Sequence, residues 1–215
     1  MMVANSYDVM FILSILFIIS GEIYMTRYTK RQIKEVVYHE LGHWVVAREV
    51  GFDVGSIFIK LIDEVGYLPN HRGVSHAYPS PSLKQIEDVK RYIVDRGAVA
   101  SAGVACQIHF LGGDEREVFD RFGEGDLMKI EELSLIYRGI IHPNETNTEL
   151  EKEQRHEYII LVWETALKII ADKEDALKHA VATLSNLIKE DNVEYEFKVD
   201  DLSELFSSSP SSKYQ

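Results

Sequence analysis

The sequence predicts a mostly helical α+β protein, in which one metal-binding helix lies beside a small β-sheet and a helical bundle follows towards the C-terminus. Three observations predict this. An H-E-x-x-H pattern lies within a segment of helical apolar spacing at residues 29–50. Two short runs rich in β-branched and apolar residues follow it. Beyond them, most of the chain has the periodicity of amphipathic helices.

The first predicted helix covers residues 29–50, and Gly51 is a natural stop after it. Residues 54–62 form the first predicted strand, and residues 73–78 the second. Residues 70–73 have the composition of the turn or loop that precedes this second strand. These three elements place a short sheet directly after the motif helix.

The rest of the chain is predicted to be helical with one late strand. A long helix opens with Ser82 as its cap and ends at Gly112. Its small residues from Gly97 to Cys106 let another helix approach closely, and we expect them to pack on the motif helix. Cys106 is expected to be a small buried residue. The remaining predictions are helices over 126–137, 150–171, 175–190 and 200–206, and a strand through the alternation 193–199.

The H-E-x-x-H pattern consists of His39, Glu40 and His43. On a helix, positions i and i+4 share one face, so both imidazoles can bind the same metal ion. The carboxylate of Glu40 can then reach a metal-bound water as a general base without being a ligand. This layout is typical of a zincin-like zinc peptidase with an open coordination position.

The third ligand is not fixed by the motif itself. The metzincin extension fails, because Glu49 stands where its third histidine should be. Two acidic residues remain as alternatives. Glu64 follows the first strand in a loop-like setting, and Asp126 lies at the start of a helix in Gly125-Asp126-Leu127.

From about Tyr28 to Phe206 the chain resembles the peptidase domain of the FtsH-type ATP-dependent zinc proteases. The resemblance rests on 38–43 (YHELGH), 53–57 (DVGSI), 73–78, the small-residue helix at 95–106, Gly125-Asp126-Leu127 and the C-terminal helices. It implies a zinc metalloendopeptidase that cleaves unfolded or extended polypeptides. It also implies Zn²⁺ as cofactor, His39, His43 and Asp126 as its ligands, and Glu40 as the catalytic base.

Two departures from that family are visible in the sequence. Val104 and Gln107 replace an arginine and a glutamate of the family's G-R-A-A-E-E segment. The chain also has no G-x-x-x-x-G-K-[ST] phosphate-binding loop. We therefore expect either a separate AAA-type ATPase as partner or a limited set of exposed substrates, and the resemblance implies a hexameric ring. A non-proteolytic zincin-fold binding or regulatory module that retains zinc is the alternative function.

Composition limits the partners and the compartment. The formal net charge is −12, with a pI near 5.1 and no basic stripe, which argues against a nucleic-acid partner. A single cysteine permits no disulfide within the chain and fits a reducing, cytoplasmic compartment. The apolar run within residues 9–25 is short for a membrane span, so a membrane anchor and a buried helix are both open interpretations.

The expected domain therefore covers residues 28–206, after an apolar segment at 1–27 and before a Ser-rich, disordered tail at 207–215. Two other histidines receive predictions. His76 lies beside the second strand, where it is either a donor to substrate or an ordinary polar surface residue. His109 is expected to be a core residue on the apolar face of its helix. His71, His109, His142, His156 and His179 form no ligand spacing with one another.

Overall fold

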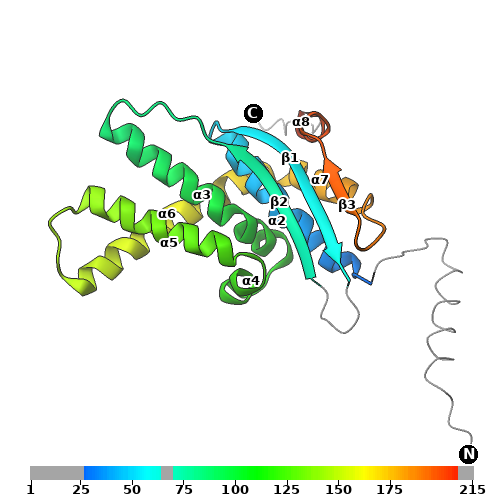
Figure 1. Cartoon of the computed structure of the whole chain (residues 1–215), viewed down its shortest axis with the longest axis horizontal. Coiled ribbons are helices and arrows are strands. Elements are labelled where there is room, and N and C mark those ends of the chain that lie inside the picture. The colour runs from blue at the N-terminus through cyan, green and yellow to red at the C-terminus, as the bar shows by residue number, and fades with distance from the viewer. Residues whose placement is uncertain (1–26, 64–69, 208–215) are drawn as a thin grey trace, which may run out of the picture.

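The structure is a computed structural model that describes residues 27–63 and 70–207, a mostly helical chain with one three-stranded antiparallel sheet (Figure 1). This confirms the predicted α+β class. The apolar segment within 1–26, Glu64 and the tail from 208 lie outside the described residues. The elements are α2 (Lys30–Glu49), β1 (Asp53–Ile62), β2 (Asn70–Tyr78), α3 (Ile86–Leu111), α4 (Glu115–Phe122), α5 (Glu124–Ile141), α6 (Thr148–Asp172), α7 (Glu174–Ser185), β3 (Glu194–Phe197) and α8 (Val199–Ser207).

Helix α2 is the central element, and its ends are set by local chemistry. Thr29 and Gln32 form a reciprocal capping box at its start, which satisfies backbone donors that a helix leaves unpaired. It ends at Glu49, and Gly51 follows with φ of 88°, a backbone conformation that favours glycine. Most of α2 is buried, which holds its side chains in fixed positions.

The sheet has the strand order β2-β1-β3 and packs against α2 through β1 and β2 (Figure 1). In β1, Ile57, Ile59 and Leu61 are buried, whereas Phe58 and Lys60 between them are partly exposed. β2 pairs with β1 from Asn70 to Tyr78 and leaves its other edge without a described strand.

Helix α3 crosses α2 closely, as its small residues predict. A β-carbon added at Gly42 of α2 would overlap the carbonyl of Ala102 and the side chain of Cys106 on α3. Cys106 is fully buried there, as expected, and burial raises the pKa of its thiol. The crossing therefore depends on glycine at position 42.

The helices after α3 cover its remaining faces. α5 and α6 pack on α3, around a second apolar cluster that includes Ile93, Phe119, Ile130 and Val162. α7 packs on α2, and α8 packs on α7. No helix in the described part of the chain combines the length and apolar character needed to cross a bilayer.

Several predicted boundaries were wrong. β2 begins at Asn70, because pairing of Asn70, His71 and Arg72 with β1 overrides their turn propensity. α3 begins at Ile86 rather than at residue 82, since Gln85 and Asp88 supply its cap. α7 ends at Ser185, and the turn after it lets Ile188 be buried.

Other differences lie further along the chain. α4 was not predicted, although Asp114 caps it well. α5 is longer than the predicted 126–137 at both ends, and Val199 begins α8 instead of ending a strand. His109 is exposed at the C-terminal end of α3, 3.7 Å from Glu174, so it is not a core residue.

Candidate metal centre

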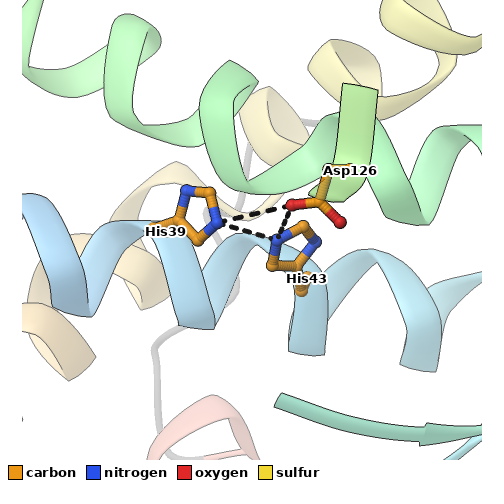
Figure 2. A group of neighbouring side chains, drawn as sticks. All are labelled: His39, His43 and Asp126. Atoms are coloured by element: carbon orange, nitrogen blue, oxygen red, sulfur yellow. Dashed lines mark hydrogen bonds and ion pairs between the residues drawn. The ribbon is translucent and has the colours of Figure 1, made fainter. Parts of the chain in front are cut away.

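Three side chains that are distant in sequence converge beside α2. His39 and His43 project from α2 towards Asp126 in the first turn of α5 (Figure 2). The Nε2 atoms of the two histidines are 3.0 Å apart, and Oδ2 of Asp126 lies 3.1 Å from Nε2 of His43 and 3.6 Å from Nε2 of His39. Each residue offers one donor atom, so the group could hold a metal ion.

The spacing of these donor atoms fits a tetrahedral ion. Bonds of about 2.0–2.1 Å at tetrahedral angles place ligand atoms about 3.3 Å apart. The observed separations of 3.0, 3.1 and 3.6 Å bracket that value. Two imidazoles and a carboxylate form the kind of donor set that binds Zn²⁺ and leaves a fourth position open.

Helix α3 orients both imidazole rings from behind. Nδ1 of His39 lies 3.0 Å from Oε1 of Gln107, and Nδ1 of His43 lies 2.6 Å from the carbonyl of Val99. A carbonyl oxygen can only accept, so each Nδ1 carries the proton and each Nε2 keeps its lone pair for a metal. Gln107 is 2 % exposed, which makes it a rigid part of this arrangement.

The rings fit against α3 because Gly103 has no side chain. A β-carbon there would overlap Nε2 of His43 and the ring of His39. The small-residue stretch of α3 thus serves two purposes, since it permits the crossing with α2 and makes room for the rings of His39 and His43.

The carboxylate of Glu40 is buried beside His39, His43 and Asp126. The residue is 5 % exposed, and burial raises the pKa of its carboxyl group, opposed by the neighbouring histidines and a hydrogen bond from the backbone N–H of Ser75. A β-carbon at Gly73 would overlap this carboxylate. Strand β2 therefore lies directly against Glu40.

Asp126 and His43 shift each other's pKa values. Burial alone would raise the pKa of Asp126, but His43 and His39 beside it hold the pKa well below its usual range. Burial opposes a charge on His43 as well, yet Asp126 raises the pKa of His43 to about 9. Protonated His43 and ionised Asp126 therefore form an ion pair. A metal ion bound by these residues would replace the proton of His43.

The site opens into a cavity of about 640 Å³ between β2, α2, α3 and the turn from α4 to α5. His39, Glu40, His43 and Asp126 all line it, as do residues of β2. A volume of this size lies within the range of about 300–1,000 Å³ that is typical of ligand-binding pockets.

Strand alternation decides which further histidine faces this cavity. His71 is paired with buried Leu61 of β1, so it lies on the α2 side, contacts the ring of Phe122 at 5.0 Å and lines the cavity. His76 is on the opposite face, against Phe58 and Tyr78. The prediction of a donor at His76 is therefore not supported by the geometry.

Burial gives His71 a second property, since it lowers the pKa of this side chain to about 4, with His39 and Arg121 acting in the same direction. His71 is therefore neutral at pH 7. Two features of the sequence are compatible with these positions but do not establish them: His71 stands two residues before Gly73, and Gln107 lies one helical turn after Gly103.

The chain matches no protein-family model, and no curated protein matches it.

Proposed function

We propose that this chain is an FtsH-type zinc metalloendopeptidase that hydrolyses peptide bonds in unfolded or extended polypeptides. His39, His43 and Asp126 would hold Zn²⁺, since their spacing fits a tetrahedral ion and their rings are oriented with free Nε2 atoms. The resemblance of the sequence supports the choice of family.

The buried carboxylate of Glu40 is the observation that carries the proposal. A structural metal site needs four protein ligands and no base. Here the three possible ligands are accompanied by a carboxylate with a raised pKa at the wall of an open cavity. A carboxyl group with a raised pKa is a better proton acceptor near neutral pH, as general base catalysis requires.

The bound ion would supply Lewis acidity towards the peptide carbonyl and its attacking water. Glu40 would take the proton of that water and give it to the leaving amine. Gln107 and Val99 would keep the ligand rings in place during the reaction, and the N–H of Ser75 would hold the carboxylate of Glu40.

The edge of β2 that pairs with no described strand is the proposed binding site for substrate. β2 is an edge strand, and its residues from Asn70 to Ser75 line the cavity. A peptide added to this edge would be held by backbone hydrogen bonds, which tolerate many sequences. Its scissile bond would pass Glu40, because Gly73 lies against that carboxylate.

This geometry favours substrates that can be extended. A folded domain offers no free strand, and opening one costs a large part of its stability, typically about 5–15 kcal/mol. We therefore propose that a separate AAA-type ATPase delivers folded substrates, and that a hexameric ring is the working assembly, both from the family resemblance.

The decisive experiment compares unfolded casein cleavage by wild type and Glu40→Gln, with zinc content measured in both. Glu40→Gln should retain zinc but lose at least about 10²-fold in rate. Glu49→Gln is the matched control, because Glu49 is exposed at the end of the same helix and pairs with Lys173. Equal turnover by Glu40→Gln and wild type would exclude a catalytic base at this position.

Zinc binding without cleavage by the wild type would instead favour the non-proteolytic regulatory module.

A further inference from the structure

The cavity beside the metal ligands carries an excess of positive charge that the metal site does not use. The chain has a formal net charge of −12, yet Arg96, Arg121 and Lys129 all line this cavity. Among the residues that the structure describes, two carboxylates line it, those of Glu40 and Asp126, and both belong to the proposed reaction centre.

Each of these cations comes from a different helix and is weakly neutralised. Arg121 on α4 lies 3.9 Å from Glu35, which is closer to Arg31 at 3.2 Å. Lys129 on α5 lies 3.7 Å from Asp126. A metal ion bound by Asp126 would weaken that second attraction, since it would take up much of the charge of the carboxylate.

Arg96 on α3 is the least satisfied of the three. It is partly buried, and no ion pair or hydrogen bond joins its side chain to another residue in 27–63 or 70–207. Asp95 beside it in sequence projects from another part of the helix surface and lines a different pocket. A guanidinium has five donors in a planar fork that matches a carboxylate.

The position of Arg96 brings it close to the reaction centre. Val99, whose carbonyl accepts from His43, follows three residues later on α3, and both residues line the same cavity. Three residues of helix rise by about 4.5 Å. In an extended peptide, residues i and i+2 are about 7 Å apart. If a peptide bond is held at the metal ligands, a carboxylate up to two residues away in the same peptide is therefore within reach of the long Arg96 side chain.

The fourth cation at the cavity wall, Arg72, does not contribute to this arrangement. It pairs with Lys60 in the register of β1 and β2, so its side chain lies on the sheet face away from α2.

We propose that Arg96, supported by Lys129 and Arg121, forms a carboxylate-binding subsite that makes this chain prefer polypeptide segments with an acidic residue close to the scissile bond. A scissile bond exists only if the chain is a peptidase, so this inference rests on the proposed function. Binding of a peptide at the subsite can nevertheless be measured without hydrolysis. The net charge of the chain predicts the opposite preference, because a chain of −12 repels acidic peptides at long range.

The test uses the full chain carrying Glu40→Gln, loaded with zinc, and fluorescence anisotropy of three labelled peptides of one sequence. One has glutamate near its centre and an amidated C-terminus, one has glutamine there and an amidated C-terminus, and one has glutamine with a free C-terminal carboxylate. The glutamate peptide should bind at least about tenfold more tightly than the amidated glutamine peptide, the size expected of one charge-assisted contact. The advantage should shrink with added salt.

Introducing Arg96→Gln should remove that advantage, and Arg96→Lys should restore part of it. Arg91→Gln is the matched control, because Arg91 is exposed on the same helix, pairs with Asp88 and does not line this cavity. Tight binding of the glutamine peptide with a free terminus would support the subsite and identify a terminal carboxylate as a second source.

Equal or weaker binding of the glutamate peptide would overturn the proposal, and so would an equal effect of Arg91→Gln and Arg96→Gln. Turnover of the same peptides by the wild type tests the peptidase separately. A preference in binding without any turnover would refute the proposed function and leave the subsite established.

Discussion

Replacing Gln107 by leucine should weaken zinc binding by about 10- to 100-fold while the chain stays folded. Oε1 of Gln107 accepts from Nδ1 of His39 at 3.0 Å, and the residue is 2 % exposed. Leucine fills a similar volume but removes the acceptor of that N–H. Without a metal the ring can turn or change its tautomer, but a zinc-bound ring must keep the proton on Nδ1, so the unpaired donor costs the zinc-bound form about 1–3 kcal/mol. Since 1.4 kcal/mol corresponds to a factor of ten in affinity, this cost agrees with the predicted loss of about 10- to 100-fold in zinc affinity.

The assay is a competition titration of zinc between the purified protein and a chelator of known affinity, with thermal unfolding followed in parallel. Gln107→Glu is the conservative control, because it keeps an acceptor at the same position and should hold zinc at least as well as the wild type. An affinity of Gln107→Leu within twofold of the wild type, in a folded protein, would refute the argument that α3 orients the ligand ring.

Three further predictions concern the ligand group. The Asp126→Ala variant should lose most of its zinc. The control Glu124→Ala changes an exposed residue in the same helical turn and should retain zinc. Equal zinc content in the two variants would exclude Asp126 as a ligand. Gly103→Ala should displace the ligand rings and reduce zinc content, whereas Gly139→Ala, with nothing near its added carbon, should stabilise α5 by up to about 1 kcal/mol in chemical denaturation. With metal removed by a chelator, the raised pKa of His43 contributes stability that is fully present below its ordinary pKa of 6.5 and is lost as the pH rises to about 9. The melting temperature should therefore fall between these two pH values. A melting temperature that does not change over this range would contradict the ion pair of His43 with Asp126.

The sequence alone was sufficient for the class of fold and for the close crossing of α3 on α2. Periodicity located α2, and the small residues of α3 predicted its contact with the motif helix. Boundaries were less well predicted where tertiary pairing overrides local preference. Asn70 to Arg72 have turn propensity, but pairing with β1 makes them a strand.

The candidate site could be predicted only in part. The i, i+4 spacing of His39 and His43 is a local property of a helix, and so it is visible in the sequence. Asp126 needed the family resemblance, because residues alone left Glu64 as an alternative. The roles of Gln107 and His71 depend on which sides of α3 and β2 face α2, and no local pattern states this.

The origin of the three ligands has a mechanical consequence. His39 and His43 belong to α2, whereas Asp126 belongs to α5, a helix that packs chiefly on α3 and α6. An ion held by all three would be a cross-link between two helices that otherwise meet mainly through a third. Metal binding would thus couple the start of α5, and α4 just before it, to the central helix α2. The part of the cavity wall that α4 and α5 form would then be rigid only when the ion is bound.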